Sequence, residues 1–487
     1  MNHKVVFLPQ NISITVADNT TVLQAQISAG LSPDAPCGGK GTCGKCKVKI
    51  EKEVLLACQT PVRKDMVVTL PVQEAPEILT GGISNQVCAD ASHKYVVAFD
   101  IGTTTLVGFL LDGKSGKLLG SASSVNPQTQ YGADVITRIE TALSRSKPVV
   151  RCSVIRALRK LLWQMASEQG IGTDQISLVT IVGNTAMHHL MLGIDPSPLV
   201  RPPYMPSVSD AMEIPVDDLL PIDPDGMLRI LPNIAGFVGG DTVSCMVAAD
   251  FGNRKDLTLM IDIGTNGEMV LGNCDRRIAC STAAGPAFEG AKITQGMRGS
   301  PGAIDRVWLK DDKLYYHIIG RPEASGICGS GLLDLIACLL DLGIIDESGY
   351  LQNKKYTLPR SKVRLTQSDV REVQLAKAAI RAGIELMCEA LGVKPADIQT
   401  VLLAGAFGNY MDPKSACRIG MIPPILLDRI TPIGNAAGEG AKLCAVNRDI
   451  YEYAKELAAK TEFLELATLP EFQDRFVDAL EFAEEDL

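Results

Sequence analysis

The sequence predicts an α/β protein of two similar lobes, preceded by a small β-rich α+β domain. The main observation is a repeated motif: an apolar run at 96–99 leads into Asp100-Ile-Gly-Thr, and another at 257–261 leads into Asp262-Ile-Gly-Thr. A short apolar run followed by glycine predicts a buried strand that ends in a tight turn. The length of 487 residues also exceeds one ordinary hydrophobic core, so we expect a duplicated body.

Composition narrows the class of protein. Hydrophobic residues make up 46% of the chain and charged residues 21%, which is typical of a globular protein. The net charge of −9 argues against nucleic acid as a partner, since that requires a basic face. The sequence shows neither a cationic leader with an apolar stretch nor an uncharged run of membrane-spanning length. We therefore expect a cytoplasmic protein without a membrane partner.

Residues 1–70 are predicted to form the small first domain. The runs 5–8 and 12–16 indicate a β-hairpin, residues 23–29 a short helix and residues 47–50 a further strand. Residues 71–93 are rich in turn-forming residues and show no periodicity, which predicts a flexible linker.

Four of the fourteen cysteines are grouped in this first domain. They follow the spacing C-x5-C-x2-C-x11-C, within C-G-G-K-G-T-C-G-K-C and L-L-A-C, at Cys37, Cys43, Cys46 and Cys58. Glycines between thiolates let a loop wrap an inorganic core and direct N–H groups at the sulfur atoms. The pattern favours a 2Fe–2S cluster over a zinc site or unligated thiols. Scattered cysteines elsewhere read as small buried hydrophobic residues.

The body divides at about residue 255, and each half presents its elements in the same order. A phosphate-type hairpin comes first, then helices, then a strand that ends in glycine, and last a glycine-rich start to a helix of small residues. In the first lobe, residues 94–255, these elements are expected at 106–111, 154–167, 177–182 and 239–249. In the second lobe, residues 256–487, they are expected at 269–272, 331–342, 371–391, 400–404 and 434–444, followed by an amphipathic helical tail after 462.

The two Asp-Ile-Gly-Thr turns have the chemistry of a nucleotide site. Glycine lets the backbone approach closely, N–H groups and threonine hydroxyls point inward, and the aspartate holds hydrated Mg²⁺. Asp100 and Asp262 are therefore the candidate Mg²⁺-binding carboxylates for ATP. The candidate phosphate-binding residues are Gly102, Thr103, Thr104, Thr105, Gly264, Thr265, Asn266 and Gly267.

The duplicated order resembles the superfamily of ATPases that includes acetate and sugar kinases, heat-shock proteins and actin. The resemblance implies two lobes that face each other across a cleft, with two glycine-rich helices crossing at a hinge. It also implies Asp241 as the catalytic group that orients the attacking water, although helix N-capping is the alternative role for this residue. The resemblance assigns the adenosine motif to Gly405, Ala406, Phe407 and Gly408.

Two other motifs have less specific interpretations. His188 and His189 lack a third ligand at metal spacing, so a capping or packing role is favoured over metal binding or general-base chemistry. The glycine-rich turn at 326–331 is equally consistent with a helix N-terminus and with a loop that recognises a partner.

The first domain resembles plant-type ferredoxins, with one extra residue in the cysteine loop and an early fourth cysteine. The whole arrangement resembles the reductive activators of corrinoid proteins. The motifs that carry this likeness include F-D-I-G-T-T-T, I-V-G-N-T-A-M-H-H, I-D-I-G-T-N-G-E, A-A-G-P-A-F-E-G, L-A-G-A-F-G-N and L-A-T-L-P-E-F-Q-D-R-F. The resemblance implies an ATP-dependent enzyme of anaerobic methyltransferase systems. It would pass one electron from a 2Fe–2S cluster to Co(II) and restore Co(I) for methyl transfer.

The same resemblance implies partners. They are a corrinoid protein and an electron donor such as a ferredoxin. Larger family members carry an extra domain tied to dimerisation between ferredoxin and ATPase, whereas a short linker stands here; a homodimer is therefore one of the arrangements left open. The alternative functions are an activator of another low-potential enzyme, such as a dehydratase, and a redox-sensing small-molecule kinase. A binding protein with a degenerate ATPase is disfavoured by the intact Asp100 and Asp262.

Overall fold

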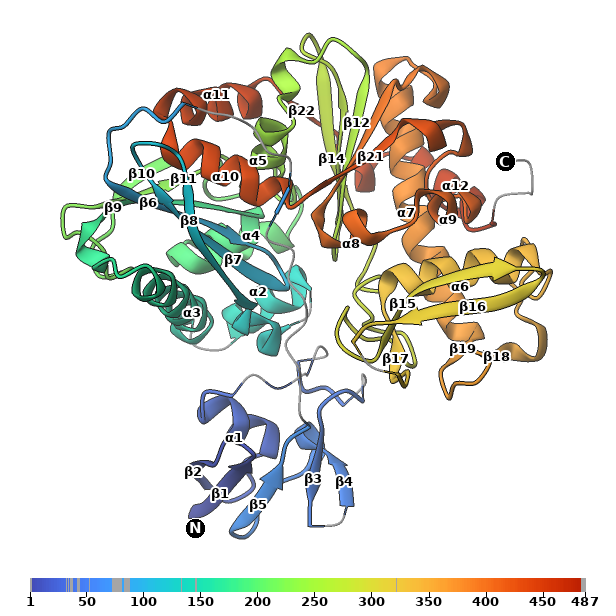
Figure 1. Ribbon diagram of the computed structural model, residues 1–487, viewed down its shortest axis with the longest axis horizontal. Coiled ribbons are helices and arrows are strands. Elements are labelled where there is room, and N and C mark those ends of the chain that lie inside the picture. Colours follow the sequence, from blue (N-terminus) through green and yellow to red (C-terminus); the bar gives the residue numbers. More distant parts are fainter. Residues whose placement is uncertain are drawn as a thin grey trace.

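The computed structural model describes residues 2–31, 33, 35, 38–41, 44–51, 53–71, 81–82, 88–132, 134–144, 147–320 and 322–482. A small β-sheet domain lies below two α/β lobes that stand side by side (Figure 1). Among the described helices, none combines the length and the apolar character that crossing a membrane requires.

The N-terminal domain is a five-stranded sheet with strand order β2-β1-β5-β3-β4. Its strands are β1 (Asn2–Leu8), β2 (Ile12–Ala17), β3 (Lys47–Ile50), β4 (Glu53–Leu56) and β5 (Met66–Thr69). The helix α1 (Val22–Ser28) begins at Thr21, whose hydroxyl accepts the N–H of Gln24 in a capping box. Val5 and Phe7 alternate into the core beneath this helix. The predicted hairpin, helix and strand of this domain are confirmed.

The first lobe is built on a six-stranded sheet with order β10-β11-β9-β6-β7-β8. The strands are β6 (Tyr95–Ile101), β7 (Thr105–Asp112), β8 (Leu118–Val125), β9 (Ile176–Gly183), β10 (Met212–Pro215) and β11 (Met227–Ile230). Its helices are α2 (Val135–Ser144), α3 (Lys147–Glu168), α4 (Thr185–Leu192) and α5 (Gly240–Ala248). The strand and the small-residue helix expected at 177–182 and 239–249 are confirmed, and α3 begins earlier than the predicted 154.

The second lobe carries a sheet with order β21-β20-β12-β13-β14-β22. Its strands are β12 (Thr258–Ile263), β13 (Gly267–Gly272), β14 (Arg277–Thr282), β20 (Thr400–Ala404), β21 (Ile430–Gly434) and β22 (Glu462–Phe463). Its helices are α6 (Gly329–Asp341), α7 (Gln367–Leu391), α8 (Gly405–Tyr410), α9 (Pro413–Arg418), α10 (Ala436–Val446), α11 (Arg448–Ala459) and α12 (Glu471–Asp478). A smaller sheet of β15 (Ala303–Lys310), β16 (Lys313–Ile318) and β17 (Gly326–Ile327), and a hairpin of β18 (Lys355–Thr357) and β19 (Arg364–Thr366), extend this lobe.

The two main sheets repeat one topology, as the duplicated motif predicts. In the first lobe β6, β7 and β8 form an antiparallel meander, and β9 runs parallel to β6. In the second lobe β12, β13 and β14 form the same meander, and β20 runs parallel to β12. Asp100 and Asp262 occupy the same place in the two units, next to the last residue of the first strand. Both turns therefore face a common space between the lobes.

Helices α5 and α10 pack against each other between the two sheets, shown centrally in Figure 1. The Ser244 hydroxyl donates a 2.6 Å hydrogen bond to the Ala437 carbonyl across this contact. A Cβ added to Gly440 would lie 2.0 Å from the Ser244 carbonyl oxygen, so only glycine permits this approach. The small residues of the two predicted hinge helices thus serve a close crossing.

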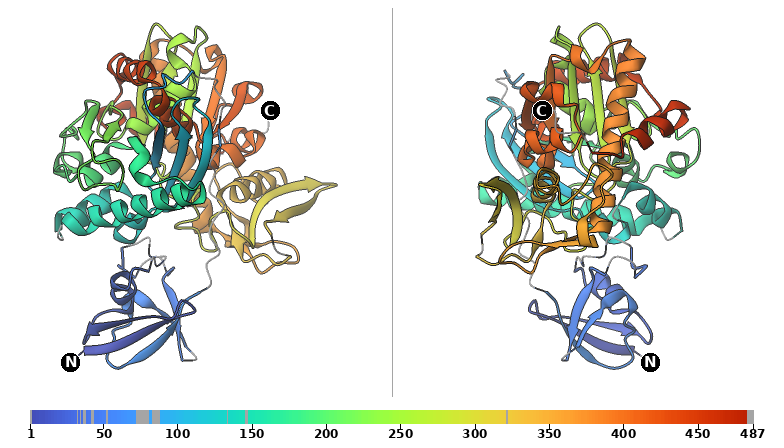
Figure 2. Two further views of the ribbon diagram at one scale, coloured as in Figure 1. Left: turned by 60° about the vertical axis from the view of Figure 1, so that its left-hand side comes forward. Right: turned by 90° about the vertical axis from the view of Figure 1, so that its right-hand side faces the viewer.

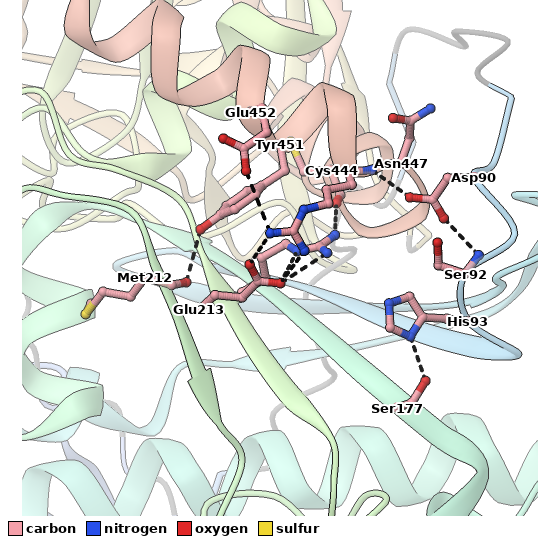
Figure 3. Close-up of polar contacts among 12 residues, drawn as sticks. Asp90, Ser92, His93, Ser177, Met212, Glu213, Cys444, Asn447, Tyr451 and Glu452 are labelled. Carbon is pink, nitrogen blue, oxygen red and sulfur yellow. Dashed lines mark hydrogen bonds and ion pairs between the residues drawn. The ribbon is translucent and has the colours of Figure 1, made fainter.

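The segment 71–93 is described at Pro71, Gly81, Gly82 and 88–93, and Gly81, Gly82, Cys88 and Asp90 contact the second half of the chain. Asn435 N–H donates to the Gly81 carbonyl at 2.9 Å, and the Asn447 side chain donates to the Cys88 carbonyl at 2.8 Å. Asp90 accepts the N–H of Arg448 at 2.8 Å beside a cluster around Glu213 and Tyr451 (Figure 3). The described parts of the segment are therefore held against α10 and α11; its predicted flexibility stays a prediction.

Candidate functional site

A cavity of about 520 Å³ lies between the two lobes, and both Asp-Ile-Gly-Thr turns open into it. Of the predicted nucleotide-site residues, the following line it: Asp100, Gly102, Thr103, Thr104, Thr105, Asp241, Asp262, Gly264, Thr265, Asn266, Gly405, Ala406 and Phe407. Gly267 lies in β13 opposite Thr282, and Gly408 packs against Leu403, so these two predicted residues stand outside the lining. The fold therefore gathers residues from four separate parts of the chain, at 100–105, 241, 262–266 and 405–407.

Six carboxyl groups line this cavity, and four of them have a raised pKa: Asp100, Asp241, Asp262 and Glu268. Burial raises the pKa of Asp100 to about 7, and the nearby Asp262 adds to this shift, whereas a hydrogen bond from Asn435 opposes it. Burial likewise raises the pKa of Asp241 to about 7, and Asp262 and Asp100 contribute. Carboxylates that repel one another in this way favour a bound cation.

Burial also raises the pKa of the other two carboxyl groups, Asp262 and Glu268. Burial raises the pKa of Asp262 to about 6, although the Cys245 thiol, with its sulfur 3.9 Å from the carboxylate oxygen, lowers it slightly. Burial and the charge of Asp241 raise the pKa of Glu268. Within the described residues, no group of three or more such side chains stands at direct metal-binding geometry.

Asp241 lies in the first turn of α5, whose N-cap is Gly239. Its carboxylate accepts the N–H of Thr242 at 2.8 Å. The side chain thus satisfies one of the free N–H groups at this helix start and also faces the cavity.

The first Asp-Ile-Gly-Thr turn, residues 100–103 (the first phosphate turn), is held from behind by three side chains, of which only Asn184 belongs to a motif of the sequence. Asn126 Nδ2 donates to the Gly102 carbonyl at 2.8 Å, and Asn184 Nδ2 donates to the Thr103 hydroxyl at 3.0 Å. Arg138 donates to the Thr103 carbonyl at 2.8 Å. Each bond fixes the backbone or the hydroxyl of the turn, so the turn keeps its shape before any ligand enters.

Arg138 is fully buried, and no ion pair among the described residues includes it. Burial lowers its pKa to about 10, and the carboxylates of Asp134 and Glu289 partly offset this. The guanidinium therefore stays charged at neutral pH and places a positive charge beside the first phosphate turn. Arg138 could not be identified from the sequence, because it lies on α2, outside every motif.

The second Asp-Ile-Gly-Thr turn, residues 262–265 (the second phosphate turn), is joined to the first through Glu289. The Thr104 hydroxyl donates to one carboxylate oxygen of Glu289 at 2.8 Å, and the Thr265 hydroxyl donates to the other at 3.0 Å. Thr104 belongs to the first lobe and Thr265 to the second. One carboxylate thus bridges the lobes at the hydroxyls that the sequence predicts as phosphate contacts.

Part of the cavity wall is apolar. Phe288 stacks on Phe407, with ring centroids 4.7 Å apart and an interplanar angle of 13°. The start of α6, within the glycine-rich turn 326–331, lines the cavity through Cys328, Gly329 and Ser330. Of the two interpretations of this turn, the helix N-terminus is therefore what the structure contains.

The predicted cluster site is described at two of its four cysteines; Cys37 and Cys43 lie outside the described residues. The β3–β4 hairpin pairs Lys47 with Leu56, and Ala57 N–H donates to the Cys46 carbonyl at 2.8 Å. This register brings Cys46 and Cys58 to neighbouring positions. The loop folds back over them: a Cβ added to Gly39, whose φ is +86°, would lie 3.9 Å from Cys58 Cβ. Two thiol side chains beside such a loop suit an iron–sulfur cluster.

The histidine pair serves packing, as predicted. Both side chains are buried in α4. His189 Nδ1 lies 2.7 Å from the Thr185 carbonyl and its Nε2 accepts the Ser207 N–H at 3.1 Å. Burial lowers the pKa of His188 to about 3, so that ring is neutral.

Three family descriptions match successive parts of the chain. "2Fe-2S iron-sulfur cluster binding domain" matches residues 6–64. "RACo middle region" matches residues 95–254, and "C-terminal domain of RACo the ASKHA domain" matches residues 256–487. The first domain therefore carries a 2Fe–2S cluster, and the two-lobed body binds nucleotide. The predicted fold class is confirmed.

Individual proteins are similar over most of the chain. "Corrinoid activation enzyme RamQ" of Eubacterium limosum is 37% identical over 413 residues, which cover 79% of this chain and 69% of that protein. "[Co(II) methylated amine-specific corrinoid protein] reductase" of Methanosarcina barkeri is 27% identical over 426 residues, covering 80% and 77%. The solved structure "Reductive activator for corrinoid,iron-sulfur protein" superposes with a TM-score of 0.73 at 29% identity, covering 100% of this chain and 99% of its own.

Proposed function

We propose the function from one premise: the chain belongs to the family of reductive activators of corrinoid proteins. It reduces the Co(II) of a corrinoid protein by one electron and so restores Co(I), the nucleophile of methyl transfer. The observation that carries the proposal is that the structure of a reductive activator for a corrinoid,iron-sulfur protein matches the whole of this chain, the N-terminal domain and the two-lobed body alike. A 2Fe–2S cluster held by the cysteine loop supplies a one-electron carrier.

The reduction is proposed to be driven by ATP in the cavity between the lobes. Each 1.4 kcal/mol drawn from the nucleotide corresponds to about 60 mV for one electron. Asp100 and Asp262 would hold Mg²⁺ through its water molecules, one carboxylate from each lobe. When the two lobes close over the nucleotide, the cation would neutralise both carboxylates and so lower their mutual repulsion.

The roles of the remaining side chains follow from where they lie in the cavity. The hydroxyls of Thr104 and Thr265, which line the cavity, would donate to phosphate oxygens. Arg138 lies behind the first turn, and its charge would stabilise the phosphates through that turn. Asp241, at the start of α5, would orient the water that attacks the terminal phosphate. The stacked Phe288 and Phe407 would provide an apolar wall for the nucleoside end.

The decisive experiment is anaerobic and spectroscopic. The protein, MgATP, a chemical reductant and candidate Co(II) corrinoid proteins are mixed, and the absorption of Co(I) is followed. We expect Co(I) with at least one corrinoid protein, in an amount that depends on ATP. The absence of Co(I) with every candidate would contradict the proposal and favour a dehydratase activator or a kinase.

Further parts of the proposal concern the setting of the reaction. A ferredoxin or similar protein would deliver the electron, and the reaction would take place in the cytoplasm. A homodimer is the arrangement that we propose to test by light scattering.

A further inference from the structure

The loop that follows β14, residues 284–302, reaches from the nucleotide cavity to the N-terminal domain. At the cavity it presents Glu289, which accepts hydrogen bonds from Thr104 at 2.8 Å and from Thr265 at 3.0 Å. At its other face it presents the carbonyl groups of Gly290 and Gly296. Glu289 and Gly290 are consecutive residues, so the two functions of the loop adjoin each other.

Glu289 occupies an anion site. Its carboxylate takes the two hydroxyl donors that face each other across the lobes, and it lies close enough to Arg138 for mutual attraction. A phosphate group is an anion that uses the same donors. Two anions repel at this range, so a nucleotide phosphate bound to Thr104 and Thr265 requires the carboxylate to leave.

The outer face of the loop holds the cysteine loop of the N-terminal domain. Lys45 lies between Cys43 and Cys46 in the sequence, and its Nζ donates to the Gly296 carbonyl at 2.7 Å and the Gly290 carbonyl at 3.4 Å. These carbonyls converge because the loop is tightly folded: a Cβ added to Gly296 would lie 2.4 Å from the Gly290 oxygen. The lysine therefore binds one particular conformation of the 284–302 loop.

The cysteine loop also approaches the first lobe. A Cβ added to Gly38 would lie 3.9 Å from the Tyr131 carbonyl oxygen. Tyr131 ends the short helix that begins after Asn126, and Asn126 donates to the Gly102 carbonyl of the first phosphate turn. Figure 2 shows the N-terminal domain below the two lobes from two further directions. The cysteine loop thus contacts each lobe next to the segment that supports its phosphate turn.

We propose that the 284–302 loop is a nucleotide-dependent docking site for the N-terminal domain. ATP displaces Glu289 from Thr104 and Thr265, the carbonyls of Gly290 and Gly296 move with it, and Lys45 loses its acceptors. The cysteine loop, which faces the lobes when docked, is then released toward a partner protein. This inference rests on the proposed function, since it takes ATP as the ligand of the cavity.

The first test is the affinity of the full-length, cluster-containing protein for ATP, measured by calorimetry. Docking opposes ATP binding, so Lys45→Met should lower the Kd for ATP about tenfold, which corresponds to about 1.4 kcal/mol. Glu289→Ala should also lower it, and Lys45→Met should add nothing in that background. Lys49→Met removes the same charge from an exposed position on β3 and should leave the Kd unchanged.

Additive effects of Lys45→Met and Glu289→Ala, or an unchanged Kd in Lys45→Met, would overturn the docking proposal while the parent still binds ATP. A parent protein that binds no ATP would overturn the nucleotide site itself, so the two failures are distinct. Glu289→Gln, which keeps the shape of the side chain, should give an intermediate Kd and serves if the alanine variant does not fold.

The second test measures the domain position by small-angle X-ray scattering. A non-hydrolysable ATP analogue should increase the radius of gyration of the parent. Lys45→Met should have the larger radius without nucleotide, whereas Glu289→Ala should stay compact with nucleotide, because its loop need not move. If Glu289 had only a structural role, Glu289→Ala would not give a protein that binds nucleotide while its N-terminal domain stays docked. Equal radii in all states would overturn the proposal.

Discussion

Asp100 is a buried carboxyl group whose ionisation in the nucleotide-free protein is unfavourable. Its folded-state pKa of about 7 lies above the ordinary value of 3.8, because protein surrounds it and Asp262 is near. A group with a raised folded pKa contributes stability that is complete below pH 3.8 and is lost as pH rises through about 7. The contribution of Asp100 is therefore expected to make the nucleotide-free protein less stable at pH 8 than at pH 5.

Asp100→Asn should remove that pH dependence. At pH 8 the uncharged side chain should stabilise the nucleotide-free protein by about 1–3 kcal/mol, since the full shift overstates a group that faces a cavity. At pH 5 the effect should be small. Thermal unfolding at both pH values measures it, and loss of ATP hydrolysis should accompany it. A variant no more stable than the parent at pH 8 would contradict the expected repulsion.

Asp112 is the matched control for this prediction. Hydrogen bonds from Ser115 lower the pKa of this partly exposed aspartate. A lowered folded pKa contributes stability above the ordinary value, which is lost as pH falls. Asp112→Asn should therefore destabilise the protein slightly at both pH 5 and pH 8, in the opposite direction to Asp100→Asn at pH 8.

Arg138 is expected to act on phosphate through Thr103. Arg138→Met should weaken ATP binding by at least tenfold, because a hydrogen bond to a charged group contributes about 1.5–3 kcal/mol and the positive charge is lost with it. Arg138→Lys should recover part of the affinity. Binding of adenosine is the control measurement: it lacks phosphates, so its Kd should change much less. An equal loss for adenosine and ATP would assign Arg138 to the fold alone.

The crossing of α5 and α10 is the element on which the position of the two lobes depends. Gly440→Ala places a methyl group against the Ser244 carbonyl, at a separation that no real structure tolerates. The helices must move apart, and we expect a loss of about 3 kcal/mol in stability, at the upper end for overpacking. ATP affinity should fall as well, since the cavity lies between the lobes.

Gly120→Ala on β8 is the comparison for this variant. There the added Cβ would lie 3.5 Å from the flexible Gln169 side chain, an ordinary contact. Urea denaturation of both variants should separate a close helix crossing from a general effect of glycine replacement. Equal midpoints for Gly440→Ala and the parent would show that α5 and α10 separate without cost.

The whole molecule divides its chemistry between two domains, and the division can be tested. Cys58→Ser should abolish the visible iron–sulfur absorption and Co(II) reduction, while ATP binding persists. Asp262→Ala should leave that absorption intact and abolish ATP hydrolysis and ATP-dependent formation of Co(I). If either variant loses both properties, the two sites do not act as separable parts.

Much of the architecture follows from local sequence. The paired Asp-Ile-Gly-Thr turns, the apolar strands and the glycine-rich helix starts are each coded within a few residues, because strand burial and turn geometry depend on nearest neighbours. The helix α7 was predicted to within a few residues from its periodic apolar positions. Boundaries were less accurate where polar residues begin a helix, as at Lys147 in α3.

The sequence by itself determined the candidate residues for the proposed chemistry: the cysteine loop, the two aspartate turns and the predicted adenosine motif. Only the tertiary structure decided how they cooperate. Glu289 joins Thr104 to Thr265, Arg138 supports Thr103, and Lys45 reaches Gly296. These contacts join segments from 24 to 251 positions apart, so no local pattern records them. Such contacts form because charges and hydrogen-bond donors interact with groups that are close in space, whatever their separation along the chain.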